Sequence, residues 1–140
     1  MNEPAYLAHL MPQTEDSEPF WRACNESRLV LRHCGQCHTV FYYPRRLCPA
    51  CGSQRLGWHT ASGRGTVFSF SEIHVPFAGP DWSSQLPYTV VLVDLEEGPR
   101  MLTRLIGDTR AELRIGDALE VCFIEVDQQK LPFFRRVAGH

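Results

Sequence analysis

Short runs of apolar and β-prone residues follow one another through the second half of the chain, and glycines and prolines separate the runs. Residues 87–95 are nearly continuous in apolar residues, whereas Leu119, Val121 and Phe123 share one face, as in a β-strand that buries one side. The expected strands span residues 66–75, 87–95, 101–106, 119–126 and 131–137. Residues 108–114, between the third and fourth strands, could form one helical turn. Five strands with a small helical insertion at this place predict an OB-fold barrel, and closure leaves few exposed strand edges.

The first half of the chain is expected to begin with an arm and a short helix. Residues 1–16 contain prolines and polar residues without periodicity, so we expect an extended arm. A short helix is expected next, because Ser17 or Asp16 can cap it and Pro19 sits in its first turn. Its apolar side chains follow at nearly helical spacing: Phe20, Trp21, Cys24 and Leu29. Phe20 and Trp21 are too much apolar surface for so short a helix to leave in water. The helix therefore docks either on the neighbouring part of this chain or on a partner chain, and the sequence leaves both open.

Three short β-prone segments follow the helix, at residues 29–33, 39–43 and 55–59. Pro44 ends the second segment, because proline cannot donate a hydrogen bond to a β-ladder. Gly63-Arg64-Gly65 marks a turn into the barrel. We therefore divide the chain into an arm and helix over 1–28, a small β-module over 29–62 and a barrel domain over 63–140. The expected fold class is mainly β.

Four cysteines in two Cys-x-x-Cys pairs dominate the small β-module: Cys34, Cys37, Cys48 and Cys51. Two such hairpins bring four thiolates to the corners of a tetrahedron, which zinc prefers in structural sites. The pattern predicts a zinc ribbon whose metal holds structure and has no open position for water. Gly52 can adopt positive φ and aim backbone N–H groups at the sulfurs. Two disulfides are the competing interpretation, although disulfides are rare in reducing compartments.

Two histidines and the two remaining cysteines are weaker candidates for metal ligands or nucleophiles. His33 and His38 flank the first cysteine pair and could replace a thiolate, but the sulfur set is already complete, so we expect them beside the site. Cys24 and Cys122 lie among apolar residues and are expected to pack as small buried hydrophobes. No nucleophile elbow or paired-carboxylate motif is present. We therefore assign no catalytic residue.

Composition and charge narrow the function classes. The 140-residue chain is 44% hydrophobic and has a net charge of −2, and its pI is about 6.3. The barrel half carries more acids than bases, which argues against nonspecific binding to phosphate backbones. No apolar run approaches the roughly 20 residues needed to span a bilayer, and the first residues lack the basic start of a signal peptide. A soluble protein of the cytoplasm is expected.

The order of the motifs resembles a known family. The matching segments are, in order, Pro19-Phe20-Trp21, Leu31-Arg32-His33-Cys34, Cys37, Pro44-Arg45, Cys48-Pro49-Ala50-Cys51-Gly52, Gly63-Arg64-Gly65-Thr66-Val67-Phe68-Ser69-Phe70, Pro87-Tyr88, Ile115-Gly116-Asp117 and Leu119-Glu120-Val121. They cover about residues 17–138 and resemble the DUF35 proteins, which join a rubredoxin-like zinc ribbon to a C-terminal OB-fold.

The resemblance implies a partner. DUF35 proteins act as non-catalytic subunits of thiolase-superfamily enzymes, pack on the thiolase-like dimer and help shape its CoA or acyl channel. The enzyme supplies the nucleophile for acyl transfer, condensation or retro-aldol chemistry on CoA thioesters. The expected cofactors are therefore structural zinc and a CoA thioester shared with the partner, and the dimeric enzyme suggests two copies of each chain.

Aromatic residues and arginine on weakly structured segments favour interfaces. On this ground we expect the partner or channel surface to include Phe20, Trp21, Tyr43, Arg45, His74, Phe77 and Trp82. Phe41 and Tyr42 belong to the same ribbon edge, although at least one of them is expected to fill the ribbon core. His74 could contact a CoA channel, and Arg45 and Arg46 could meet the CoA phosphates. Exposed, solvated positions are the simpler interpretation of His74, Arg45 and Arg46.

Two competing functions remain at this point. Zinc ribbons and OB-folds both commonly bind single-stranded nucleic acid, but that mode needs a basic groove with stacking aromatics. The acidic barrel half disfavours it. An independent acyl-CoA carrier would require CoA affinity in the isolated chain.

Overall fold

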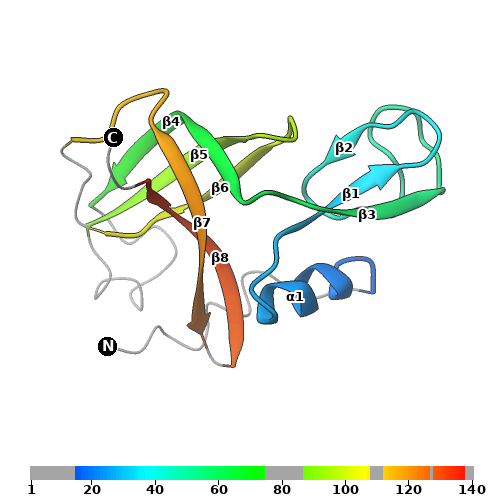
Figure 1. Cartoon of the computed structure of the whole chain (residues 1–140), viewed down its shortest axis with the longest axis horizontal. Helices are drawn as coiled ribbons and strands as arrows, with labels where there is room; N and C mark the ends of the chain where they lie inside the picture. Colours follow the sequence, from blue (N-terminus) through cyan, green and yellow to red (C-terminus); the bar gives the residue numbers. More distant parts are fainter. Residues whose placement is uncertain (1–14, 75–86, 108–111, 127, 138–140) are drawn as a thin grey trace.

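The computed structural model describes residues 15–74, 87–107, 112–126 and 128–137. One helix, α1 (Glu18–Asn25), comes first. The strands follow in the order β1 (Val30–Cys34), β2 (Val40–Phe41), β3 (Leu56–Thr60), β4 (Arg64–Ile73), β5 (Tyr88–Leu95), β6 (Arg100–Leu105), β7 (Ala118–Val126) and β8 (Gln129–Arg136). Figure 1 shows a small β-lobe beside a larger barrel, with α1 lying below the small lobe and next to β8. The predicted mainly β fold is confirmed.

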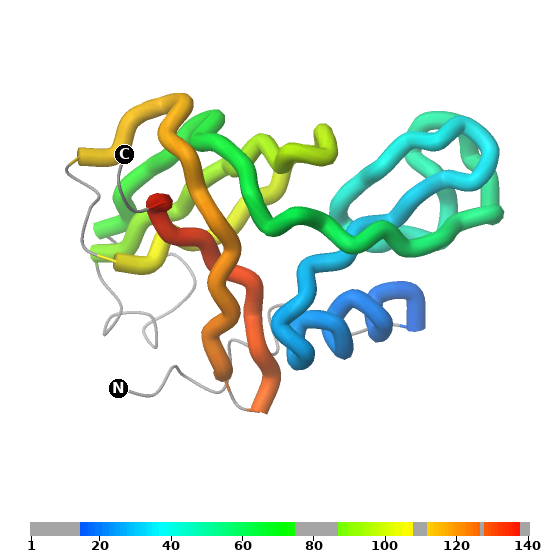
Figure 2. The backbone as a smooth tube through the Cα atoms, viewed as in Figure 1, coloured from blue at the N-terminus to red at the C-terminus, as the bar shows by residue number. Residues whose placement is uncertain are grey.

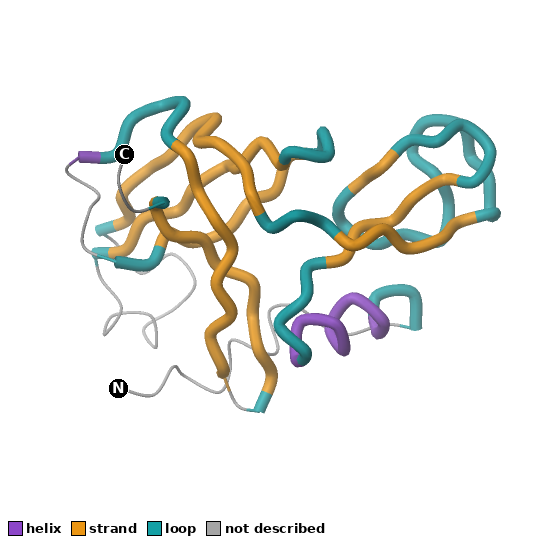
Figure 3. The backbone as a smooth tube through the Cα atoms, in the orientation of Figure 1, coloured by secondary structure: helices purple, strands orange, loops and turns teal. Residues whose placement is uncertain are grey.

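The larger lobe is a closed five-stranded barrel with the strand order β4-β5-β6-β8-β7. Side chains along β5 alternate between a buried and a half-buried face, with Val91 and Val93 fully buried. The tube in Figure 2 follows the strands around the barrel, and Figure 3 shows that strand makes up most of the described part of the barrel. The expected OB-like barrel is therefore confirmed. The predicted helical turn over 108–114 lies partly outside the described residues.

Strand β4 joins two sides of the barrel, as its predicted length suggested. It pairs with β5 along most of its length and with β7 at its start, where Arg64 lies opposite Glu120. A shift of register between Val67 and Ser69 bends it, as β-bulges do. Gly65 is needed near this bend, because a Cβ there would lie 2.5 Å from the Val93 Cγ1 atom and 2.6 Å from the Asp94 carbonyl oxygen.

The smaller lobe is a three-stranded antiparallel sheet with the order β2-β1-β3. Arg32 of β1 lies between Phe41 on one side and Trp58 on the other. The lobe's own core consists of Cys34, Phe41 and Cys48, with Leu56 packed against them. This core is very small, so other forces must hold the lobe together. The boundaries 28/29 and 62/63 stay predictions.

Helix α1 packs against its own chain, which corrects the assignment of Phe20 and Trp21 to an exposed partner surface. Their relative exposures are 0% and 1%. The Phe20 ring lies 5.7 Å from the Tyr42 ring and 5.9 Å from the Tyr43 ring, and the Trp21 indole N–H donates to the Tyr43 hydroxyl at 3.1 Å. Aromatic rings at such distances attract each other beyond simple burial.

The other side of the helix is tied to β8. The Gln129 side-chain amide donates to the Trp21 carbonyl at 3.0 Å, and the Lys130 N–H donates to the Asn25 side chain at 2.8 Å. The helix therefore connects the small lobe to the barrel. Ser17 occupies the N-cap position as predicted, but its side chain makes no capping hydrogen bond.

Candidate metal centre

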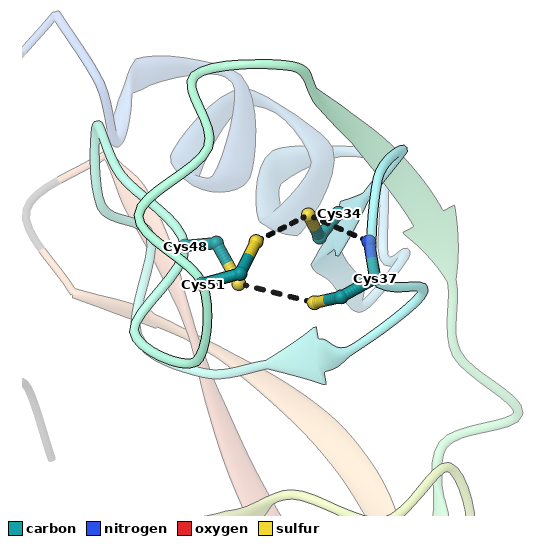
Figure 4. A group of neighbouring side chains, drawn as sticks. All are labelled: Cys34, Cys37, Cys48 and Cys51. Carbon is teal, nitrogen blue, oxygen red and sulfur yellow. Dashed lines mark hydrogen bonds between the residues drawn. The ribbon is translucent and has the colours of Figure 1, made fainter.

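Four sulfur atoms converge at one end of the small lobe (Figure 4). Cys34 ends β1 and Cys37 lies in the turn that follows it, whereas Cys48 and Cys51 come from the connection between β2 and β3. Each Sγ atom lies within 4.8 Å of the other three. Thus the two predicted pairs meet as the sequence indicated.

The distances fit a metal centre and not disulfides. Cys34 Sγ lies 3.6 Å from Cys51 Sγ, and Cys37 Sγ lies 3.6 Å from Cys48 Sγ. A disulfide needs about 2.0 Å between its sulfurs, and all four thiols are free. A tetrahedron with zinc–sulfur bonds of about 2.3 Å has edges of roughly 3.8 Å. The competing interpretation of two disulfides is therefore wrong.

Backbone N–H groups surround two of the sulfurs. The N–H groups of Gln36 and Cys37 each reach the Cys34 sulfur at 3.4 Å, and the Ala50 N–H reaches the Cys48 sulfur at the same distance. Such donors stabilise a thiolate. The Cys37 N–H is the largest cause that lowers the pKa of Cys34, to about 6.

The other two thiols show why a cation belongs here. The Thr39 hydroxyl lies 3.1 Å from the Cys37 sulfur and lowers its pKa. A Ser53 N–H lowers the pKa of Cys51, but burial and hydrogen bonds from the three other thiols raise it overall, to about 12. Four thiolates this close cannot all ionise without a positive charge among them. The donor set fits zinc, which would hold all four sulfurs and leave no open position for chemistry.

The glycines act less directly than their sequence positions suggested. Gly52 has the predicted positive φ, of 78°, but its N–H donates to the Cys48 carbonyl at 2.9 Å and not to a sulfur. The Gly35 N–H donates to the Arg55 carbonyl at 2.7 Å. Both glycines therefore shape the knuckles, while neighbouring residues supply the N–H groups. The rings of His33 and His38 lie 5.9 Å apart, and neither belongs to the ligand group.

The structure describes five of the seven residues that were expected on a partner surface, and the role of the exposed ones stays a prediction. Tyr43 is half-buried beside Trp21, and Arg45 is exposed on the small lobe. His74 is exposed just after β4, where its Nε2 atom lies 2.7 Å from the Glu72 carboxylate. Phe77 and Trp82 lie outside the described residues.

Burial disfavours the thiolate form of both remaining cysteines. It raises the pKa of Cys24 to about 12 and also raises the pKa of Cys122. With a pKa of about 12, the Cys24 thiol is almost entirely protonated at neutral pH and is a poor nucleophile. Cys24 is fully buried in the main core, as predicted for a packing residue.

A cavity beside the helix was not predicted from the sequence. Its volume is about 200 Å³, and its lining is Trp21, Tyr42, Tyr88, Val90, Met101, Leu102, Thr103, Arg104, Leu131, Pro132 and Phe133. The available signal was Leu102, an apolar residue at a position where the alternation of β6 calls for a polar one. In the part of the chain that the structure describes, no helix has the length and apolar character to cross a membrane.

Comparison with known proteins gives two family matches. Residues 21–57 match the model of the ChsH2 rubredoxin-like zinc ribbon domain, and residues 58–123 match the model of the ChsH2 C-terminal OB-fold domain. The two matches adjoin within β3, so together they cover the zinc ribbon and most of the barrel.

Several relatives are similar over most of this chain. A DUF35 domain-containing scaffold protein of Pyrococcus furiosus is 34% identical over 104 residues, which cover 73% of this chain and 74% of that protein. A probable enoyl-CoA hydratase alpha subunit of Thermomonospora curvata is 36% identical over 128 residues. That match covers 89% of this chain but only 39% of the relative's length.

Among solved structures, a chain of the Ltp2-ChsH2(DUF35) aldolase is similar with a TM-score of 0.78 and 34% identity. The match covers 89% of this chain and 96% of that chain. Sequence and structure agree on the same pair of domains in the same order, so the protein belongs to the DUF35 family, as a zinc ribbon followed by an OB-fold barrel.

Proposed function

We propose that this protein is a non-catalytic, zinc-bearing accessory subunit of a thiolase-like enzyme. It packs on that enzyme and helps shape its channel for CoA thioesters, while the enzyme carries out acyl transfer, condensation or retro-aldol cleavage. The observation that carries the proposal is the match over almost the whole chain to a chain of the Ltp2-ChsH2(DUF35) aldolase.

The chemistry of the chain supports an accessory role. The four clustered thiols suit a closed metal shell, which holds structure and activates no water. Cys24 is buried with a raised pKa, far from the form that attacks a thioester. The names of relatives point the same way, since one is a probable enoyl-CoA hydratase alpha subunit and another a scaffold protein.

The rival function, binding of single-stranded nucleic acid, finds less support. The net charge is −2, and the exposed barrel arginines Arg64, Arg100 and Arg135 are paired with Glu96, Asp94 and Glu120. A strand-binding groove needs unpaired cations along its length. Binding to single-stranded DNA that weakened steeply with added salt would favour the rival.

The test is co-expression of the full chain with each thiolase-like or aldolase-type protein encoded in the same genome. A stable complex is expected by size-exclusion chromatography, with acyl-CoA activity that falls when this subunit is omitted. Cys24→Ala serves as a control that leaves the metal ligands untouched. An enzyme that is fully active and stable without this chain would refute the proposal.

A further inference from the structure

The barrel is least continuous at the seam between β6 and β8. The described pairing of these strands is limited to Leu105 opposite Phe134, with the Ile106 N–H donating to the Phe134 carbonyl at 2.8 Å. Away from that point the Thr103 hydroxyl bridges to the Pro132 carbonyl at 2.8 Å. A cavity of about 200 Å³ lies at this seam. Trp21 of α1 and Tyr42 of the zinc ribbon line it on one side, and residues of β5, β6 and β8 line it on the other.

This cavity is almost entirely apolar and is open to the surface. An apolar cavity of roughly 150 Å³ is enough to hold a benzene molecule, so the space suits one large aromatic or aliphatic side chain. Its walls are preformed, because Trp21, Met101 and Leu131 are each at most 4% exposed. A guest side chain would therefore bind without rearranging the barrel.

An apolar strip continues from the cavity over the outside of the barrel. Leu92 lies opposite Leu102, and Val90 lies opposite Arg104, so these side chains share the outward face of β5 and β6. Leu102 is 60% exposed. Val90 and Leu102 line both the cavity and a second hollow of about 110 Å³, which Ser69, Phe70 and Ser71 of β4 complete. The two hollows are thus neighbours on one surface.

Cationic side chains border the strip. The Arg104 guanidinium lies 5.3 Å above the Tyr88 ring at the cavity wall. The Arg100 guanidinium lies 3.4 Å above the exposed Phe68 ring and 2.7 Å from an Asp94 oxygen. An apolar centre with an aromatic and arginine border is the composition of a protein interface and its hot spots.

We propose that this cavity and strip are the surface on which the partner enzyme docks. The partner inserts one large apolar side chain into the cavity and covers Val90, Leu92 and Leu102. This inference rests on the proposed accessory function and moves the main interface from α1 and the ribbon edge to the outer face of β5 and β6.

The surface favours a protein partner over a small ligand. A ligand that filled the cavity would leave Leu102 and Leu92 in water, whereas a partner chain covers both hollows together. A second copy of this chain fits less well. A symmetric contact presents the same strip to itself, whereas the similar solved structure is a chain of an aldolase named for two components, Ltp2 and ChsH2, which favours a different chain as the occupant.

The test uses the purified complex from the co-expression experiment and measures its dissociation constant for four variants. Leu102→Arg places a charge on an exposed strip position, Val90→Trp fills the cavity, and Arg104→Glu reverses the border charge. Ile115→Arg is the matched control, since Ile115 is an apolar residue that is 72% exposed and lies outside both hollows.

Leu102→Arg and Val90→Trp are expected to weaken binding on the order of 100-fold, as loss of a hot spot does. Arg104→Glu is expected to weaken binding roughly tenfold, because it places a negative charge at the wall of an apolar cavity. Ile115→Arg should stay within about twofold. Leu102→Arg changes an exposed side chain and should leave the fold intact, and the thermal midpoints of all free variants check this.

Three results would overturn the proposal. A Leu102→Arg complex as tight as the wild-type complex would rule out this surface as the docking site, while the accessory function would still stand. A wild-type chain that self-associates through the strip in sedimentation, with Leu102→Arg monomeric, would assign the surface to a second copy. A wild-type chain that binds none of the thiolase-like proteins would overturn the proposed function and this surface together.

Discussion

Removal of the metal should unfold the zinc ribbon and leave the barrel folded. The ribbon's own core contains one buried aromatic ring, Phe41, and the half-buried Leu56. Burial of these two side chains contributes about 3 to 5 kcal/mol at most. Fixing the backbone of only about three residues costs a similar amount. Zinc supplies roughly 10 to 16 kcal/mol in sites of this kind, so the metal decides whether the ribbon folds.

The assay is hydrogen exchange followed by mass spectrometry, before and after treatment with a strong chelator. In the folded ribbon the Cys34 N–H donates to the Thr39 carbonyl at 2.9 Å and the Gly35 N–H to the Arg55 carbonyl at 2.7 Å. Peptides that contain these amides should lose protection without metal, while peptides from β5 and β7 keep theirs. Readdition of zinc should restore protection.

A matched pair of variants separates metal binding from the loss of any thiol. Cys48→Ser should lower the zinc content and expose the same ribbon amides, whereas Cys24→Ala should retain the full zinc content. The reasoning would be refuted if the Cys34 and Gly35 amides stayed protected in metal-free protein, because the small core would then suffice to fold the ribbon.

Three further results are expected. Burial raises the pKa of Cys24 above its ordinary value of 9 to about 12, so only the unfolded state ionises between these values. The free energy of unfolding should therefore fall as pH rises above about 9, by up to roughly 4 kcal/mol. In the Cys24→Ala variant the free energy of unfolding should fall less steeply with pH over the same range. Trp21→Phe and Tyr43→Phe should show a coupling of about 1 kcal/mol in a double-mutant cycle of urea unfolding, since each removes the same hydrogen bond; additive effects would contradict it. Gly65→Ala should destabilise the protein by about 1 to 3 kcal/mol, because its Cβ would meet the Asp94 backbone, whereas Gly57→Ala has 4.0 Å of clearance and serves as the control in the same thermal melts.

The sequence predicted those features that depend on local spacing. The two Cys-x-x-Cys pairs needed only a short connection to meet, and the nearly continuous apolar run along residues 87–95 was enough to predict β5. The packing partners of Phe20 and Trp21 could not be predicted from local spacing. Their partners lie in the zinc ribbon and at Gln129, which is 108 residues from Trp21. Contacts over that distance leave no periodic signal in a single sequence.

The apolar strip on β5 and β6 was not predicted from the sequence, for a related reason. Leu102 breaks the alternation of β6, but one exposed leucine is ordinary on a protein surface. Its meaning appears only when the barrel register places it opposite Leu92 and beside the seam. Phe77 and Trp82 were predicted from composition alone, and their contribution to the partner surface stays a prediction.

The packing of α1 against β8 has a consequence for how the protein is made. The cysteines of the ribbon leave the ribosome early and can meet around a metal while the barrel is still being synthesised. The first helix must then wait for Gln129 and Lys130, near the end of the chain, before its own hydrogen bonds are complete. Until that moment the side of α1 that packs against β8 stays uncovered on the nascent chain. A folding protein of this kind has a late step that a chaperone can protect, and a truncated chain without β8 should be bound by chaperones or degraded.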